Sequence, residues 1–516
     1  MTVYILGLDG ASPELLREYI EDGDMPNFRE LRDSAVYADL ETIFPPVTPA
    51  AWTSFMTGKN PGKHGIFDFS VMNEDNEFDV ATLDTVGSDT IYDIMNREDK
   101  TVGSFGVPMT YPPRKVDGFM LSGIPVPELN ESTVYPGELW NDIEGMGGLD
   151  LYPKEYKGDN EEEYVQSHLD QIDQFRKVSL ALLEDHDLDF SISVFQNTDS
   201  MAHWMWKYID ETHPDHPEDR NYEDCLKKVY MEMDEILGEF QERMDEDDHL
   251  IVMSDHGHGA VHKNLYLNNL LADEGLLKFK KTPGTLFRRA LFKAGFTMDL
   301  AHHIIQRLGL KKYVRKTAMK SGDKGILGWV KDLVFLSDDD VDWDRTRAYV
   351  KGNFGQVFLN QELEGEERDE VVERVKELFY SVEDPETGEK IIDEVKTRDE
   401  MYHGHRVDRG PDMLFLSKDL EYMPGRHFEF GAKEVVKAHP LRTGHHKMHG
   451  IFFIDGPGIK DGETLDSASI MDVAPTVLHL MDIPVPGDMD GEVVRDAFEE
   501  EQDVETEETD SLGIDV

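Results

Sequence analysis

Aspartate and histidine residues follow short apolar runs of this sequence, where they could bind metal ions together. Asp9 ends the run Val3–Leu8, and Asp255 and His256 follow the run that ends at Met253. Glycines flank this histidine in Ser-Asp-His-Gly-His-Gly, which lets the backbone fold closely around an ion. Carboxylates and imidazoles without thiolates suit zinc, manganese or iron(II) better than magnesium or calcium.

A second group of such residues comes from two other places in the chain. Asp199 and His203 are four residues apart, so one helical turn presents both on one face. His446 lies in Thr-Gly-His-His-Lys-Met-His-Gly, just before an apolar run. Each element alone fits a loop cap or a solvated helix face better than a metal ligand. In combination, they predict two adjacent ions held where strands end.

The segment from Pro45 to Gly65 resembles the type I phosphodiesterase and nucleotide pyrophosphatase branch of the alkaline phosphatase superfamily, which includes predicted phosphohydrolases and phosphomutases. That family has a Thr or Ser nucleophile at a helix start, a Thr-Gly ten residues on and a His-Gly soon after. Thr48, Gly58 and His64 with the glycine after it fall at those places. The resemblance covers nearly all of the chain apart from a basic insertion and the C-terminal tail, and includes Met-Asp-Val-Ala-Pro-Thr from residue 471 and Gly-Asp-Met-Asp-Gly from residue 487.

This resemblance implies a metal-dependent hydrolase with Thr48 as its nucleophile and a division of the ligands between two ions. Asp9, Thr48, Asp255 and His256 would hold one ion, and Asp199, His203 and His446 would hold the other. His446 matches the family's spacing to the glycine at 450, with His445 and His449 as possible substitutes. Zinc is the expected metal and manganese the second choice.

The chemistry expected at Thr48 follows from its position at a helix start. A bound cation lowers the pKa of a hydroxyl, and a helix N-terminus stabilises an alkoxide and a phosphoryl anion. We expect in-line attack on phosphorus, a phosphothreonine intermediate and its later cleavage by water, with the ions roughly 3.5–4 Å apart. The alternative is that Thr48 is only a helix N-cap, with Pro49 in the first helical position.

Elements that could position these residues alternate between apolar β-rich runs and long helical patterns. The strand candidates are Val3–Leu8, Phe190–Phe195, His249–Met253 and Gly450–Ile454, and the helix candidates are Glu162–Leu183 and Tyr222–Met244. This alternation predicts an α/β fold of the alkaline phosphatase type, with a mostly parallel central sheet flanked by helices on both faces and an inserted cap region. Ligands of such sheets bind beyond the carboxyl ends of the strands.

Changes in composition along the chain suggest domain boundaries. We expect a catalytic core over 1–277 and 434–498, an inserted region over 278–433 and an acidic disordered tail over 499–516. Within the insertion, residues 278–331 contain fourteen basic and two acidic residues, and an α/β part covers 342–430. The basic segment could form a helical cap that attracts a phosphorylated substrate, a helix pair docked on the acidic core, or a membrane-surface element. We rank these in that order.

The strongly negative net charge of the chain suggests a salt-rich environment. There are 107 acidic and 52 basic residues, a net charge of -55, while 39% hydrophobic residues indicate a folded chain. Such a surface suits the cytosol of a halophile, as in haloarchaea, because molar salt screens self-repulsion. The alternative is an ordinary acidic protein in low salt. The charge disfavours nucleic acid as a partner. Because the first residues lack the pattern of a signal peptide and no apolar run reaches membrane-spanning length, we expect a cytoplasmic protein. A single cysteine, Cys225, rules out thiolate metal sites and intrachain disulfides.

Four further residues near the motifs have competing interpretations. Lys59 and Lys63 could contact phosphate, although solvated lysines are more common in such a loop. Trp204 and Trp206 could line a substrate pocket or pack in the core, and the sequence favours neither interpretation over the other.

The function expected from these observations is hydrolysis of a small phosphate mono- or diester. A phosphomutase is the first alternative, because it would use the same intermediate and return the phosphoryl group to its substrate. An inactive binding or membrane-surface module is the second, but it requires a missing ligand or nucleophile, and none is missing. A formylglycine sulfatase is disfavoured because the residues after Thr48 lack its Cys/Ser-x-Pro-x-Arg pattern.

Overall fold

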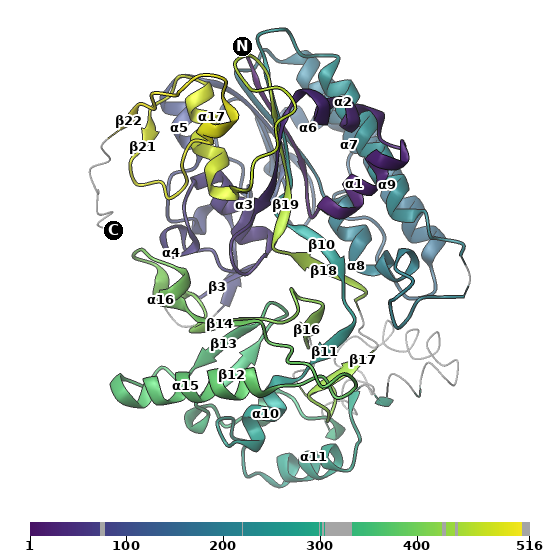
Figure 1. Ribbon diagram of the computed structural model, residues 1–516, viewed down its shortest axis with the longest axis vertical. Helices are drawn as coiled ribbons and strands as arrows, with labels where there is room; N and C mark the ends of the chain where they lie inside the picture. The colour runs from purple at the N-terminus through teal and green to yellow at the C-terminus, as the bar shows by residue number, and fades with distance from the viewer. Residues whose placement is uncertain are drawn as a thin grey trace. The chain divides into compact units, whose positions relative to one another are not determined.

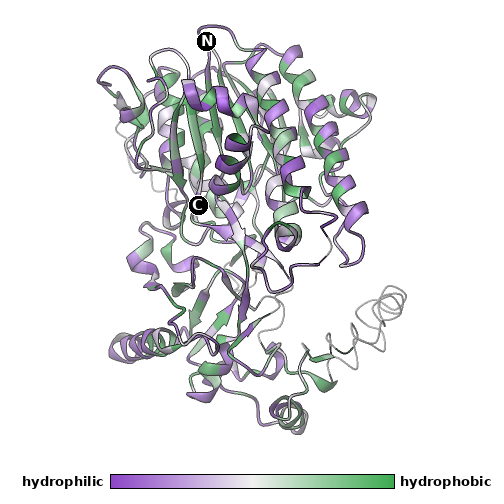
Figure 2. Ribbon diagram, turned by 45° about the vertical axis from the view of Figure 1, so that its right-hand side comes forward, coloured by the Kyte–Doolittle hydropathy of each residue, from purple (hydrophilic) through white to green (hydrophobic). Residues whose placement is uncertain are grey.

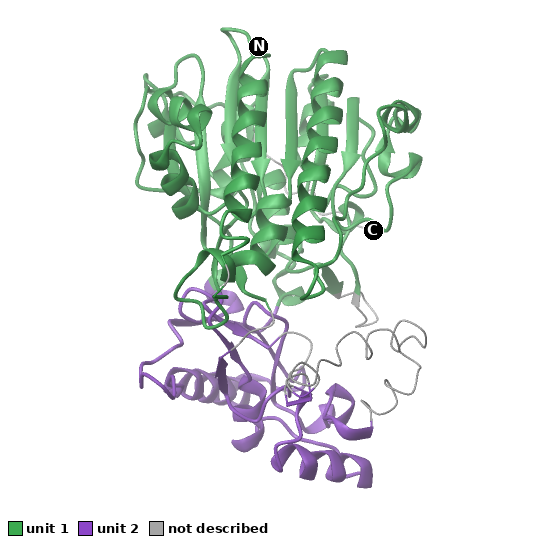
Figure 3. Ribbon diagram, turned by 90° about the vertical axis from the view of Figure 1, so that its right-hand side faces the viewer, with its two compact units in different colours: residues 1–260, 401–410, 442–516 green, residues 261–400, 411–441 purple. Residues whose placement is uncertain are grey.

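The computed structural model describes residues 1–72, 78–218, 220–298, 300–301, 304, 333–425, 430–438 and 442–507. The chain divides into two compact units, of which the first comprises 1–260, 401–410 and 442–516, and the second 261–400 and 411–441 (Figure 3). The second unit thus starts before and ends after the inserted region expected at 278–433, and the short piece 401–410 belongs to the first unit.

A nine-stranded sheet forms the centre of the first unit, in the order β20-β2-β19-β9-β1-β8-β5-β6-β7. In that order the strands span Ala468–Ser469, Val36–Glu41, His449–Asp455, His249–Met253, Val3–Leu8, Phe190–Phe195, Thr101–Val107, Asp117–Ser122 and Val134–Tyr135. The run from β9 to β6 is parallel, whereas β19 is antiparallel to both β9 and β2. The predicted mostly parallel α/β sheet is confirmed.

Helices cover both faces of this sheet, with α1, α2, α7 and α9 on one face and α3, α5 and α17 on the other (Figure 1). These helices span Pro13–Asp22, Pro26–Ser34, Glu161–Asp185, Cys225–Gln241, Thr48–Thr57, Ile91–Arg97 and Val473–Leu480. Hydrophobic residues concentrate in the strands, and the helices carry many hydrophilic residues (Figure 2). The shorter helices α4 and α6 span Pro61–His64 and Leu139–Gly145, and the hairpin strands β3 and β4 span Ser70–Met72 and Phe78–Val80.

The second unit has its own sheets and hydrophobic core. Its antiparallel sheet has the order β12-β13-β15-β14, with strands Ala348–Lys351, Gln356–Leu359, Met413–Leu416 and Glu394–Thr397. A second sheet, β16-β11-β17, consists of Tyr422–Pro424, Lys263–Leu265 and Val436–Ala438. The helices α10, α11 and α15 span Leu267–Asp273, Pro283–Lys293 and Gly365–Ser381, and the core includes Val371, Val375 and Phe379 of α15.

Only part of the basic segment 278–331 lies within the described residues. Its helix α11 begins after Thr282, whose hydroxyl accepts a hydrogen bond from the amide of Thr285. Arg288 and the hydroxyl of Thr285 both bond to the fully buried carboxylate of Asp340. This part of the segment therefore docks on an acidic residue of its own unit, and residues 305–332 lie outside the described residues.

The expected disordered tail differs from the structure in its first part. Thr506–Glu507 form a short strand, β22, parallel to β21 at Val485–Pro486. Residues 508–516 lie outside the described residues.

Candidate active site

The predicted ligand residues meet at the carboxyl ends of three neighbouring strands. β1 lies between β8 and β9 in parallel register, so Asp9, the start of α8 (Asn197–Ile209) and Asp255 come out at one edge. A two-stranded sheet of β10 (Gly257–Ala260) and β18 (Gly444–Lys447) brings in His446 opposite His258. Chain segments far apart in sequence thus contribute to a single site.

Close backbone packing holds the aspartates together. Asp9 donates its amide to the carbonyl of Phe195 at 2.9 Å and accepts from the hydroxyl of Thr198 at its own carbonyl, at 2.5 Å. Gly10 follows with a φ of 65°, and a Cβ there would lie 2.8 Å from the Cβ of Asp199. Only glycine allows this approach of the Asp199 helix to the end of β1.

One cluster consists of Asp9, Asp255 and His256, all buried, with their ligand atoms within 4.8 Å of one another. Each carboxylate has one oxygen held by a donor, since Trp52 Nε1 donates to Asp9 at 3.3 Å and the Gly10 amide donates to Asp255 at 3.2 Å. The other oxygens, Asp9 Oδ1 and Asp255 Oδ2, are buried and form no hydrogen bond among the described residues. Burial, together with nearby carboxylates, raises the pKa of both aspartates well above the usual value.

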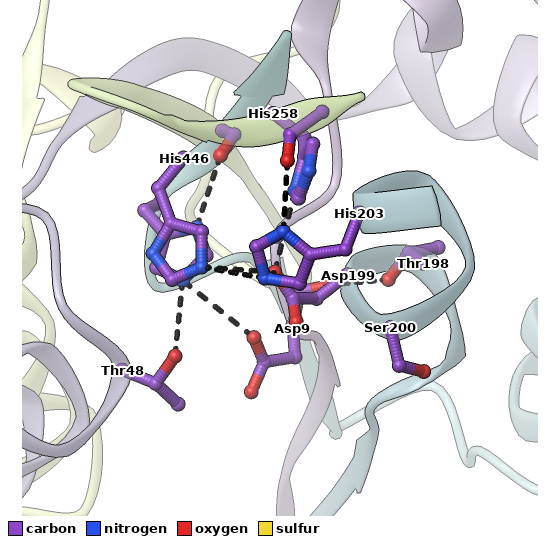
Figure 4. A network of polar contacts seen from close by, with 12 residues as sticks. Asp9, Thr48, Thr198, Asp199, Ser200, His203, His258 and His446 are labelled. Atoms are coloured by element: carbon purple, nitrogen blue, oxygen red, sulfur yellow. Dashed lines mark hydrogen bonds and ion pairs between the residues drawn. The ribbon is translucent and has the colours of Figure 1, made fainter. Parts of the chain in front are cut away.

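A second cluster is built around Asp199 (Figure 4). Its Oδ1 lies 3.2 Å from His446 Nε2 and 3.3 Å from His203 Nε2. It also lies 3.3 Å from Nδ1 of His258, which had not been predicted as a site residue. His445 is buried and forms a candidate metal group with His203 and His446, whereas His449 is exposed. The choice of His446 as the ligand stays a prediction.

The three predicted histidines are held in the tautomer that binds metal. Nδ1 of His203, His256 and His446 lies 3.0, 2.9 and 2.6 Å from the backbone carbonyl oxygens of Gly444, Gly257 and Pro46, respectively. Each Nδ1–H therefore donates to a carbonyl, which leaves Nε2 of each ring unprotonated and able to bind a cation. Burial lowers the pKa of His203 and His256 well below the ordinary value, so these rings are neutral. Neutral imidazoles and buried unpaired carboxylate oxygens fit divalent cations.

Thr48 is the first residue of α3, not its N-cap. The N-cap is Val47, which makes no side-chain capping bond. The Thr48 hydroxyl lies 3.2 Å from His256 Nε2 and donates to it, because Nδ1 holds the ring proton. The alternative interpretation of Thr48 as only a helix cap is therefore wrong, and its oxygen lies within reach of the first cluster.

The neighbouring motif residues have structural partners. Lys59 pairs with Asp488 at 2.5 Å and Lys63 pairs with Asp490, so the expectation of solvated lysines is wrong. His64 is fully buried, with Nε2 donating to Ser54 Oγ at 2.9 Å and Nδ1 accepting from the Ile66 amide at 3.2 Å. These contacts anchor the segment after α3.

The two tryptophans have different environments. Trp206 is buried and stacks on His258, with ring centroids 5.7 Å apart. Trp204 is half-buried, and the guanidinium carbon of Arg442 lies 5.7 Å from its ring centre. Arg442 also places Nη1 3.0 Å from His203 Nε2, a contact that no sequence pattern indicated. For His258 the signal was its place two residues after His256, which puts both near one strand end.

The family model for type I phosphodiesterase/nucleotide pyrophosphatase matches residues 3–450. The chain belongs to this family. As a member of the type I phosphodiesterase family, it is a phosphoric ester hydrolase of the alkaline phosphatase superfamily. None of the curated proteins searched matches the chain by sequence.

Solved structures similar to this family member share its fold at low sequence identity. Human ectonucleotide pyrophosphatase/phosphodiesterase 5 is 13% identical, with a TM-score of 0.53 over 97% of this chain and 100% of that one. Phosphonoacetate hydrolase from Sinorhizobium meliloti 1021, in complex with phosphonoformate, is 12% identical, with a TM-score of 0.55 over 93% of this chain and 95% of that one. No helix among the described residues is long and apolar enough to span a membrane.

Proposed function

We propose that the protein is a metal-dependent phosphohydrolase that cleaves a small phosphate mono- or diester through a phosphothreonine on Thr48. Asp9, Thr48, Asp255 and His256 would hold one divalent cation, and Asp199, His203 and His446 the other. The observation that carries this proposal is the 3.2 Å contact between the Thr48 hydroxyl and His256 Nε2, beside the unpaired oxygens of Asp9 and Asp255.

The residues of the chain have distinct tasks in this reaction. Bound zinc, or manganese as second choice, would supply Lewis acidity that lowers the pKa of the hydroxyl and offsets charge on the phosphoryl group. Thr48 Oγ1 attacks phosphorus in line with the leaving oxygen, and the first turn of α3 stabilises the negative charge at the attacking end. The carbonyls of Gly444, Gly257 and Pro46 keep the three imidazoles oriented throughout.

A phosphomutase would use the same Thr48 chemistry and is the alternative proposal. Rapid acid quench of enzyme mixed with substrate, followed by peptide mass spectrometry, should find phosphate on Thr48. Release of inorganic phosphate or a monoester into solution supports hydrolysis, whereas an isomerised substrate without release supports the mutase. Complete absence of phosphothreonine under single-turnover conditions would contradict both.

The substrate that we propose is a small phosphate ester, with nucleotides as the first class to test. The murine ectonucleotide pyrophosphatase/phosphodiesterase 5 structure, whose inactive form is in complex with AMP, makes nucleotides the first panel to test. The net charge of -55 leads us to propose that the protein works in the cytosol at high salt.

The substrate test compares chromogenic monoesters, chromogenic diesters and phosphorylated metabolites, each assayed in molar potassium chloride with zinc or manganese.

A further inference from the structure

His258 is a fully buried histidine whose Nε2 forms no hydrogen bond among the described residues and whose Nδ1 lies beside the carboxylate of Asp199. The residue is 1% exposed and sits on β10 directly opposite His446 on β18. A buried imidazole with an unsatisfied nitrogen lowers the stability of the folded protein, so the presence of His258 at this position calls for an explanation. His64 provides a contrast in the same unit, because both of its ring nitrogens have partners.

The position of His258 relative to Asp199 supplies that explanation. Its Nδ1 lies 3.3 Å from Asp199 Oδ1. The distances from the same oxygen to His203 Nε2 and His446 Nε2 are 3.3 and 3.2 Å. His446 Nε2 and His203 Nε2 are themselves 3.2 Å apart, although both carry lone pairs and neither can donate to the other. These nitrogens are therefore brought together by something other than mutual hydrogen bonding.

Their spacing matches that of atoms bound to one ion. Ligands at about 2.0–2.1 Å from a tetrahedral zinc lie roughly 3.3–3.4 Å from one another. The three distances from Asp199 Oδ1 to His203, His258 and His446 are 3.2 or 3.3 Å, and the distance between His203 Nε2 and His446 Nε2 is 3.2 Å. Packing also restricts the ring of His258, because Trp206 stacks on it at an interplanar angle of 24°.

We propose that His258 is a third imidazole ligand, through Nδ1, of the cation site at Asp199. This inference rests on the proposed metal-dependent function and extends its ligand set. A site of three imidazoles and one carboxylate is rich in nitrogen, which favours zinc over manganese and magnesium. His258 thus adds to the affinity and the zinc preference of this site, while Asp9, Thr48, Asp255 and His256 hold the other ion.

The test is zinc titration of metal-free protein in competition with a chromophoric chelator, comparing wild type with two variants. His258→Ala should lose about 10-fold or more in affinity at one of the two sites. His258→Asn retains an amide donor at the position of Nδ1, so it restores a hydrogen bond to Asp199 but not an imidazole ligand. It should therefore remain as weak as His258→Ala. His249→Gln changes a buried histidine at the far end of β9 and should leave both affinities unchanged.

The outcomes separate the inference from the proposed function. Wild-type affinity in His258→Ala, or recovery of affinity in His258→Asn, would overturn the ligand role and leave the two-metal function standing. Failure of the wild type to bind any divalent cation would instead overturn the proposed function itself. If the variants do not fold, anomalous diffraction from wild-type crystals grown with zinc decides the matter. Nδ1 of His258 should then lie about 2.0–2.1 Å from an ion, and a separation beyond hydrogen-bonding distance would exclude it.

Discussion

The hydroxyl of Thr48 and Nε2 of His256 are 3.2 Å apart, which links the start of α3 to the end of β9. His256 Nδ1 donates to the carbonyl of Gly257, so Nε2 is the acceptor and the threonine proton points at the ring. This contact orients the hydroxyl of Thr48.

Replacement of Thr48 tests its proposed role as nucleophile. Thr48→Ala should lower kcat by about 10⁴-fold or more, as loss of a nucleophile does in other hydrolases, whereas Thr48→Ser should retain most of the activity. Zinc content measured after dialysis should stay close to two ions per chain in both variants, because the aspartates and histidines remain. Substantial turnover by the alanine variant would exclude phosphothreonine chemistry at this position.

Arg442 provides a test of mono- against diester preference. Its guanidinium lies at His203 Nε2, and a guanidinium can bond to a phosphoryl oxygen that carries no second substituent. Arg442→Ala should lower kcat/KM for a monoester about 10- to 100-fold, because a hydrogen bond to a charged group contributes about 1.5–3 kcal/mol. The loss for a diester should be smaller.

Arg17→Ala is the control for that measurement, since Arg17 pairs with Asp39 on the surface and should affect neither substrate. Equal losses for monoester and diester in Arg442→Ala would argue that the arginine acts on the fold of the site and not on substrate choice.

His64 predicts a specific pH dependence of stability. Burial lowers its pKa to about 3, against about 6.5 for an exposed histidine. Between these values the unfolded chain binds a proton that the folded chain does not, so stability falls as pH drops from 6.5 towards 3. The loss due to this one ring is on the order of 5 kcal/mol.

His64→Gln removes that contribution while keeping a side-chain amide near Ser54. Urea unfolding of wild type and variant at several pH values should show the wild type losing more stability than the variant on acidification. A difference between the two proteins that is constant with pH would mean that His64 does not titrate in this window.

The net charge of -55 predicts strong dependence on salt. Raising potassium chloride from about 0.1 M to about 1 M shortens the Debye length from about 10 Å to about 3 Å and screens repulsion between surface carboxylates. The melting temperature should rise over this range. An uncharged osmolyte of matched osmotic strength should produce a much smaller rise, and equal effects of the two would show that the charge is not responsible.

Much of the sheet could be predicted because its central strands are short, fully buried and continuous in apolar residues. Val3–Leu8, Phe190–Phe195 and His249–Met253 begin and end where the sequence indicated. Parallel strands buried on both faces carry this signal in their composition. The position of β19 beside both β2 and β9 carries no such local signal, because strand pairing depends on the tertiary fold.

The grouping of the candidate site residues could also be predicted, because it follows from local motifs and their spacing. The seven residues expected from the resemblance and the spacing lie together, with the ligand atoms grouped in small clusters. His258 and Arg442 escaped prediction because their role depends on the orientation of one ring and one guanidinium. The 401–410 segment also could not be assigned to the first unit from sequence, since Tyr402 bonds to the carbonyl of Phe44 and His403 pairs with Asp490 across long stretches of chain.

The place of β19 between β2 and β9 has a consequence for biosynthesis. Pro46 and His446, which meet in the finished protein, are 400 residues apart, so the ribosome completes the whole second unit before β19 emerges. Until then β2 has no partner strand in the sheet and β9 has one unpaired edge, the kind of surface on which nascent chains aggregate. The proposed ligand His446 therefore emerges late, and a fragment that stops before residue 446 should not bind the ion proposed at Asp199 even if its second unit has folded.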